Sequence, residues 1–251
     1  MDKHVLVFGG TSEGRTIIQK LVERNICVTA SSLTEYGNDQ LIEHSLLTKR
    51  FGALNTEQMR TLIVDNSYDA VIDATHPYAE EISNHISQAC KKQKIRLFRL
   101  ERKKALKADE GLHFGTIQEA CSYLKNKSGK ILFTTGSNRI PEIVKILSKD
   151  RLIFRILPIK RSLDVAKVAN IKESNLLPLN PPFSIKDNVE HIKKHKVKYL
   201  VTKDSGINGG CLEKMEAIRE TNIELIIIDR PMNIYDTVYY SDEKIIEEII
   251  R

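Results

Sequence analysis

The sequence predicts an α/β protein built from two Rossmann-like lobes, with mainly parallel sheets and a cleft between the lobes. Short apolar runs alternate with longer amphipathic segments along almost the whole chain of 251 residues. Such alternation with short connections favours parallel sheets covered by helices on both faces. A polar segment without a stable period, residues 101–111, divides the alternation into two halves. This segment is the best candidate for a linker.

The first half begins with the apolar run of residues 5–8, which is too short for a helix and typical of a strand buried on both faces. In residues 15–24 the two isoleucines, Leu21 and Val22 fall on one side, as in a helix that covers a sheet. The other elements expected in this half are a strand at 26–30, a helix at 56–64, a strand at 70–72, a helix at 78–92 and a strand at 95–100.

The alternation resumes after residue 111. The expected elements are a helix at 116–126, a strand at 131–133, a helix at 140–148, a strand at 152–156, a helix at 184–195, a strand at 199–201, a helix at 211–221, a strand at 225–228 and a closing helix from residue 241. We therefore expect an N-terminal Rossmann-like lobe over residues 1–105 and a C-terminal α/β lobe over residues 106–251.

Composition excludes several classes of protein. The hydrophobic fraction is 41% and the charged fraction 29%, as in ordinary globular proteins rather than disordered chains. No apolar run approaches the ~18 residues of a membrane span, and the early first strand leaves no room for a signal peptide, so we expect a cytoplasmic protein. We expect no metal site, because the histidines lack ligand spacing and the cysteines are scattered, at Cys27, Cys90, Cys121 and Cys211.

The positive charge is concentrated in one segment. The chain has a net charge of +6, whereas residues 101–161 alone contain 14 basic and 6 acidic side chains, a net charge of +8. Such a segment attracts a polyanion, which can be a nucleic acid, a membrane surface or a small molecule. The alternative is a solvated face without a partner.

The loop Gly9-Gly10-Thr11-Ser12-Glu13-Gly14 joins the first strand to the first helix. A dinucleotide site needs a tight turn and free backbone amides at a helix N-terminus. Gly9 and Gly14 fit the outer positions of G-x-G-x-x-G, although Thr11 replaces the middle glycine. The hydroxyls of Thr11 and Ser12 suit both helix capping and phosphate binding. The loop therefore predicts a dinucleotide site, with a purely structural turn as the alternative.

The end of the second strand bears on the choice of cofactor. An acidic residue at this point usually binds the ribose 2′-hydroxyl of NAD. Here Ser31 and Ser32 are small and neutral, which leaves space for a 2′-phosphate, whereas Glu35 stands slightly later and can still take the acidic role. The sequence favours NADPH and does not exclude NADH.

Three further loops follow apolar strands. His76 is held out of helical geometry by Pro77, which suits the first position of the next helix, and a histidine there can donate a proton or a hydrogen bond. Arg139 follows a Thr-Thr-Gly turn and suits carboxylate or phosphate binding. Lys203 and Asp204 form an anion-binding or acid–base pair. Structural roles remain open for each: a core histidine, a capped helix and a surface ion pair.

Together these loops resemble the precorrin-6A reductase family, whose members act on metal-free or cobalt-containing substrates. The resemblance covers essentially the whole chain, and D-A-T-H-P-[FY]-A is its most distinctive element. It rests on residues 9–13, the run Asp73-Ala74-Thr75-His76-Pro77-Tyr78-Ala79, residues 97–102, residues 134–136, residues 201–206, and Arg230-Pro231.

The resemblance implies reduction of one C=C bond of a macrocyclic tetrapyrrole by NADPH, in cobalamin biosynthesis. It implies that the loop from Gly9 to Gly14 binds the dinucleotide pyrophosphate and that Ser31 and Ser32 face the adenosine end. Thr75, His76 and Pro77 then lie toward the nicotinamide. His76 is the leading candidate for the proton donor, with Lys203, Asp204 and a bound water as rivals. The residues expected to contact substrate are Tyr78, Thr135, Gly136, Arg139, Ser205 and Gly206.

A polycarboxylate tetrapyrrole with a phosphorylated cofactor accounts for the basic segment without nucleic acid. Two departures from the family pattern remain. Relatives often carry an arginine shortly after the second strand, where this chain has Thr34 and Glu35, and Pro181 replaces a glycine that relatives tend to have. The competing functions are a Rossmann-type reductase of another substrate and a non-enzymatic dinucleotide-binding sensor. The sequence does not indicate the oligomeric state.

Overall fold

The computed structural model describes residues 3–107, 109–206, 209–231 and 234–251. The chain divides into two compact units, which we call unit 1 (residues 1–103 and 231–251) and unit 2 (residues 104–230). The chain first passes from unit 1 to unit 2 at residues 103–104, inside the expected linker of residues 101–111. The expectation that the second lobe runs to residue 251 differs from this division, because residues 231–251 return to unit 1. There Ile245, Ile246 and Ile249 are buried against the first helix and the sheet, which explains the return.

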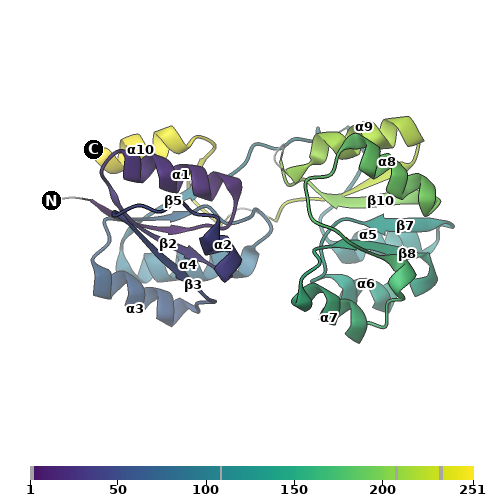
Figure 1. Ribbon diagram of the computed structural model, residues 1–251, viewed down its shortest axis with the longest axis horizontal. Coiled ribbons are helices and arrows are strands. Elements are labelled where there is room, and N and C mark those ends of the chain that lie inside the picture. The colour runs from purple at the N-terminus through teal and green to yellow at the C-terminus, as the bar shows by residue number, and fades with distance from the viewer. Residues whose placement is uncertain (1–2, 108, 207–208, 232–233) are drawn as a thin grey trace. The chain divides into compact units, whose positions relative to one another are not determined.

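Unit 1 contains a sheet of six parallel strands among the described residues. The strands are β1 (His4–Phe8), β2 (Cys27–Ser32), β3 (Leu47–Phe51), β4 (Ala70–Asp73), β5 (Arg96–Leu100) and β12 (Val238–Tyr239), in the order β12-β5-β4-β1-β2-β3. The helices are α1 (Ser12–Glu23), α2 (Glu35–Asp39), α3 (Thr56–Asn66), α4 (Glu80–Gln93) and α10 (Asp242–Ile250). Helices α1 and α10 cover one face, and α3 and α4 cover the other (Figure 1).

Unit 2 repeats this architecture over the part of it that the structure describes. Its strands are β6 (Leu112–Phe114), β7 (Lys130–Phe133), β8 (Leu152–Ile156), β9 (Leu176–Pro178), β10 (Val197–Lys203) and β11 (Glu224–Ile228), all parallel, in the order β6-β11-β10-β7-β8-β9. Its helices are α5 (Ile117–Lys125), α6 (Ile140–Ile146), α7 (Lys160–Val168), α8 (Ile185–Lys194) and α9 (Cys211–Thr221), with 3-10 turns η1 (Lys149–Arg151) and η2 (Glu173–Asn175). Helices α5, α6 and α7 cover one face, and α8 and α9 cover the other (Figure 1).

The predicted fold class, α/β with Rossmann-like parallel sheets, is confirmed. In unit 1 the strand order reverses between β1 and β4, and in unit 2 it reverses between β7 and β10. Ligands of such sheets bind beyond the carboxyl ends of the strands at this reversal. The first and second predicted loops follow β1 and β4, and the third and fourth follow β7 and β10. Each pair of loops therefore meets at a switch point.

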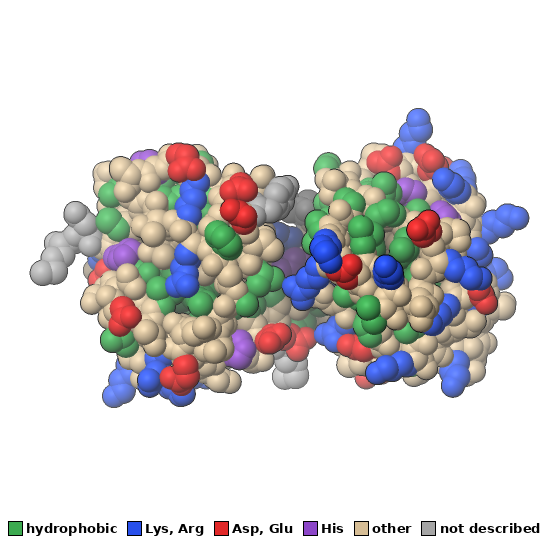
Figure 2. Space-filling view, turned by 60° about the horizontal axis from the view of Figure 1, so that its bottom comes forward, with side chains coloured by type: hydrophobic (Ala, Val, Ile, Leu, Met, Phe, Trp, Pro, Cys, Tyr) green, Lys and Arg blue, Asp and Glu red, His purple; other side chains and the backbone are tan. Residues whose placement is uncertain are grey.

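Most of the basic segment of residues 101–161 lies in unit 2, whereas residues 101–103 belong to unit 1. Figure 2 shows Lys and Arg side chains over the visible face of this unit. Lys125 is the last residue of α5, Lys127 lies between α5 and β7, and Lys149 lies just before β8. These three charges are at the amino ends of the strands, opposite to the predicted loops. Only part of the positive charge of residues 101–161 can therefore lie close enough to the switch point to attract a ligand there.

Among the helices that the structure describes, none combines the length and the apolar character needed to cross a membrane.

Candidate functional site

Thr11 connects the first two predicted loops at the switch point of unit 1. Helix α1 begins at Ser12, ahead of the residue 15 start that the apolar pattern predicted, because the Thr11 hydroxyl accepts a hydrogen bond from the Gly14 amide at 3.0 Å. The same hydroxyl donates to the Ala74 carbonyl at 2.9 Å. Thr11 is thus engaged on both sides within the protein. Its hydroxyl links the two loops, and the expectation that it also binds phosphate stays a prediction.

The glycines of this turn leave room for a ligand next to the backbone. Gly10 has a φ of +130°, and a side chain there would meet no atom within 4 Å, so this side of the turn is open. At Gly14 a Cβ would lie 3.1 Å from the Gly9 Cα, a contact that only glycine avoids. The open turn leads into the first amides of α1, where the helix dipole favours an anion.

The two serines at the end of β2 are engaged within the protein. Ser31 and Ser32 are both buried, and the Ser32 hydroxyl donates toward the Thr34 carbonyl at 2.8 Å and the Asn38 side-chain oxygen at 2.9 Å. Ser32 therefore stabilises the start of α2, and the expectation that the two serines face the adenosine end of a cofactor stays a prediction. Arg50 of β3 lies in register with Ser31, so the two side chains share one face of the sheet. Its Nε is buried and has no hydrogen-bond partner among the described residues.

Asp73, the last residue of β4, is the centre of a buried polar network. Its carboxylate pairs with Arg99 of β5 at 2.8 Å, and the exposed fractions are 0% for Asp73 and 3% for Arg99. It also accepts hydrogen bonds from Thr75 at 2.6 Å, from Ser83 at 2.7 Å and from the Tyr235 hydroxyl. Burial raises the pKa of Tyr235 and the charge of Asp73 raises it further, so the phenol stays protonated and donates. Thr75 therefore stabilises the loop after β4 through its hydrogen bond to the buried carboxylate of Asp73.

His76 lies in a turn between β4 and α4. The Ala79 amide donates to the His76 carbonyl at 2.8 Å, which places Pro77 at the second position of this turn. Helix α4 begins only at Glu80, so Pro77 is not the first helical residue as expected. The Tyr78 amide donates to Nδ1 of the half-buried His76 at 3.3 Å. Since this nitrogen accepts, Nε2 is the one that carries a proton on the neutral ring.

Arg102 is a candidate that the sequence analysis did not select. Its guanidinium pairs with Glu13 at 2.6 Å and donates to the Ser12 hydroxyl at 3.4 Å. These two residues begin α1, so a cation lies at the point where the turn is open to an anion. The charge of Glu13 at this helix end is compensated by Arg102. The run of residues 97–102 carried the family resemblance, but no spacing indicated that it reaches α1.

In unit 2 the loop after β7 contains a buried hydroxyl without a partner. Thr135 is 7% exposed, and its Oγ1 has no hydrogen-bond partner among the described residues. Gly136 has a φ of +83°, and a side chain there would meet no atom within 4 Å. Thr135 and Gly136 therefore form an open, under-satisfied turn, as a ligand-binding loop does. Arg139 is exposed and pairs with Glu142 at 2.8 Å on the same helix turn.

Asp204 directly follows β10, and its side chain is hydrogen-bonded within unit 2. Its 5% exposed carboxylate accepts the amides of Ala105 at 3.1 Å, Leu106 at 3.4 Å and Gly206 at 3.0 Å. Arg230 lies 3.6 Å from the same carboxylate and donates to the Asp204 carbonyl. Asp204 thus fixes the chain where it enters unit 2 and where it leaves. The acid–base role expected for Asp204 stays a prediction.

Lys203 and Ser205 flank Asp204 in the same loop. Lys203, the last residue of β10, is half-buried, and its carbonyl accepts the Ser205 amide at 2.9 Å. Gly206 has a φ of +77°. The loop after β7 is joined to β10 because Thr134 donates from its amide to the Val201 carbonyl at 2.9 Å. The structure therefore brings the third and fourth predicted loops together in unit 2, as it brings the first and second together in unit 1.

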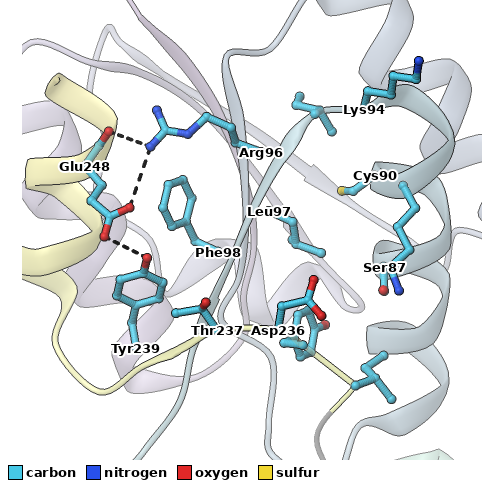
Figure 3. Close-up of a pocket in the computed structure, with 14 residues that line it drawn as sticks. Ser87, Cys90, Lys94, Arg96, Leu97, Phe98, Asp236, Thr237, Tyr239 and Glu248 are labelled. Atoms are coloured by element: carbon cyan, nitrogen blue, oxygen red, sulfur yellow. Dashed lines mark hydrogen bonds and ion pairs between the residues drawn. The ribbon is translucent and has the colours of Figure 1, made fainter.

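A pocket of about 500 Å³ lies beside the amino half of β5, away from these loops (Figure 3). Arg96, Leu97 and Phe98 line it together with the segment before β12 and the second half of α4. Within it Arg96 and Tyr239 both bind Glu248 of α10, at 2.8 Å each. None of the site residues expected from the sequence lines this pocket.

Comparisons with known proteins agree with the resemblance. A family model described as Precorrin-6x reductase CbiJ/CobK matches residues 4–250. The chain is 29% identical over 250 residues to the cobalt-precorrin-6A reductase of Priestia megaterium, with 98% of each chain covered. It is 30% identical to the cobalt-precorrin-6A reductase of Salmonella typhimurium, with 90% of this chain and 87% of the relative covered.

A precorrin-6A reductase and a solved structure are similar as well. The chain is 27% identical to the precorrin-6A reductase of Rhodococcus erythropolis, with 90% of this chain and 89% of the relative covered. A solved structure described as CobK precorrin-6A reductase matches with a TM-score of 0.78 at 18% identity, covering 99% of this chain and 96% of the other. At that identity the match supports the fold.

Proposed function

The chain belongs to the precorrin-6x reductase family, oxidoreductases of cobalamin biosynthesis that act on a CH-CH group, and we propose that it reduces cobalt-precorrin-6A with NADPH. The observation that carries the choice of reaction partners is the switch point of unit 1. There an open glycine turn and a helix N-terminus lie next to the loop that holds His76. The cobalt-containing substrate follows the relatives at 29% and 30% identity. Such a reductase would draw on the cytoplasmic NADPH pool.

The residues at the turn after β1 fit a dinucleotide. We assign the pyrophosphate to the amides of Ser12 and Glu13 and to the guanidinium of Arg102, which Glu13 holds at the helix start. Gly10 provides the open side of the turn. When bound, NADPH supplies a hydride. The protein supplies position, because catalysis by such sites is mainly orientation plus electrostatics.

His76 is the residue that we assign to the proton. Reduction of a C=C bond needs a hydride on one carbon and a proton on its neighbour. The Tyr78 amide donates to Nδ1 and orients the imidazole, so that Nε2 carries the proton of the neutral ring. The Asp73 network holds the base of the same loop through Thr75. In unit 2 we assign the turn of Thr135 and Gly136 and the loop of residues 203–206 to the substrate.

The reaction itself is the first test. The protein is incubated anaerobically with NADPH and either cobalt-precorrin-6A or precorrin-6A, and absorbance follows both the cofactor and the macrocycle. We expect stoichiometric loss of NADPH and of the conjugated substrate spectrum, faster with the cobalt-containing substrate. Turnover of neither tetrapyrrole would contradict the function. Faster turnover of precorrin-6A would contradict the choice of cobalt.

Cofactor preference is a second prediction. Arg50 has the charge and position for a 2′-phosphate next to the end of β2, where no carboxylate side chain is present in residues 27–32. We expect NADPH to bind about ten- to a hundredfold more tightly than NADH, as a charged hydrogen bond of about 1.5–3 kcal/mol gives. Titration of cofactor fluorescence measures both constants. Arg50→Gln should reduce this ratio while NADH affinity stays unchanged, and Lys49→Gln on the same strand is the control.

A further inference from the structure

Arg155 is a buried cation in unit 2 that the proposed reaction has not used. It lies near the carboxyl end of β8, with 6% of its surface exposed. Ile153, two residues earlier and on the same side of the strand, packs in the core under α8 and α9. Arg155 therefore points to the face covered by α8 and α9, at the edge where the substrate loops of unit 2 lie.

Neutral groups hold the guanidinium of Arg155 in place. Its Nη1 donates to the Asn188 side-chain oxygen at 2.8 Å, and Asn188 in turn donates to the Ser184 carbonyl at 2.8 Å. The Phe183 ring lies over the guanidinium at 4.0 Å. Burial lowers the pKa of Arg155 to about 10, so the side chain is still charged at neutral pH. Among the described residues no carboxylate lies within 4.0 Å of it.

The nearest acidic influence on Arg155 is already engaged. The charge of Asp187 acts on Arg155 from a distance. Its carboxylate accepts the Ser184 amide at 2.8 Å and the Ser184 hydroxyl at 2.7 Å, as the cap of α8. Asp187 therefore offsets Arg155 only weakly, and it cannot reach the guanidinium without uncapping the helix.

Lys214 of α9 is a second buried cation close enough to act on the first. It is 8% exposed, and its Nζ donates to the carbonyls of Gly209 at 3.0 Å and Gly210 at 2.9 Å. Burial lowers the pKa of Lys214, and the positive charge of Arg155 lowers it as well. Glu213 and Asp204 act in the opposite direction, but no described carboxylate lies within 4.0 Å of Nζ.

Two buried cations without an ion-pair partner among the described residues are costly to the folded protein. A buried charge loses its hydration, and the neutral acceptors around Arg155 and Lys214 restore it only in part. Such local conflicts are expected where a ligand completes the arrangement. The missing partner must be an anion that reaches the carboxyl end of β8. Carboxylate is the chemistry that a planar guanidinium fixed by Asn188 and Phe183 binds in a bidentate way.

We propose that Arg155, assisted by Lys214, binds a peripheral carboxylate of the tetrapyrrole and so sets the position of the macrocycle on unit 2. This inference rests on the proposed function, since that function supplies the polycarboxylate. Arg155 is then a specificity residue: it recognises the acidic side chains of the substrate and is not involved in hydride or proton transfer.

The test compares Arg155→Gln and Arg155→Lys with Arg161→Gln, an exposed arginine of the same unit. Arg155→Gln should raise KM for cobalt-precorrin-6A about ten- to a hundredfold, with kcat and the Kd of NADPH within about twofold of the parent. Arg155→Lys should have a KM between those of the parent and Arg155→Gln, because lysine keeps the positive charge but cannot donate two parallel hydrogen bonds to a carboxylate. An unchanged KM in Arg155→Gln would overturn the proposal. So would a weakened Kd for NADPH with an unchanged KM, which assigns the site to a cofactor phosphate.

Two further measurements separate this inference from folding and from the reaction. Binding of an octacarboxylate porphyrin, followed by absorbance, should weaken in Arg155→Gln and stay unchanged in Arg161→Gln, whether or not the protein turns over. Urea unfolding should show no loss of stability in Arg155→Gln, because glutamine removes an uncompensated charge and still donates to Asn188. A marked loss of stability with unchanged porphyrin binding would show that Arg155 is structural and contradict the proposal.

Discussion

Replacing Asp73 by alanine is expected to lower the free energy of unfolding of unit 1 by about 3–5 kcal/mol, the usual cost of breaking a buried ion pair. The change leaves Arg99 as a buried charge with 3% of its surface exposed. It also removes the acceptor of Thr75, Ser83 and Tyr235 at once. Urea unfolding followed by circular dichroism measures the effect, and the transition of unit 1 is the one that should move.

The control for Asp73 is an ion pair of the same kind at the surface. Asp164→Ala removes the pair with Lys160, where both side chains are more than half exposed, and should change stability by less than about 0.5 kcal/mol. A double variant, Asp73→Ala with Arg99→Met, should regain part of the loss because the buried guanidinium that lost its nearest carboxylate is gone. A loss below about 1 kcal/mol in Asp73→Ala would show that the network does not hold the loop.

The fold was largely predictable because its strong elements are buried on both faces. Residues 5–8 and 70–72 are wholly apolar runs, which only the centre of a parallel sheet accommodates. The strand over residues 47–51 was missed because it is an edge strand with two basic residues and no buried position. The two-residue strand at residues 238–239 was missed because its pairing with Arg99 and Leu100 depends on the chain returning to unit 1.

The candidate site was predictable only where its contacts are made by residues that are close together in the sequence. The turn of Gly9 and Gly14 can be read from six consecutive residues. The contact of Tyr235 with Asp73 joins residues 162 positions apart, and no pattern in one sequence specifies it. The surroundings of Asp204 also depend on distant residues. Its place after a strand suggested chemistry, but whether a carboxylate there is free depends on amides of residues 105 and 106, which come from another part of the chain.

His76→Ala is expected to lower kcat about 10²- to 10⁴-fold, the usual contribution of a positioned acid or base, while the Kd of NADPH changes by less than about twofold. The Tyr78 amide fixes Nδ1, so alanine removes the Nε2 donor without disturbing the Asp73 network. Single-turnover oxidation of NADPH with cobalt-precorrin-6A measures the chemical step, and fluorescence titration measures cofactor binding. His85→Ala is the matched control, since this half-buried histidine lies on α4 and bonds to Thr56.

His76→Gln separates a proton donor from an orienting group. Glutamine keeps a hydrogen-bond donor in this turn but does not give up a proton, so its kcat should stay close to that of alanine if His76 protonates the macrocycle. Near-normal kcat in His76→Ala would assign the proton to water or to Lys203. In that case the Asp73 loop holds the macrocycle in place rather than protonating it.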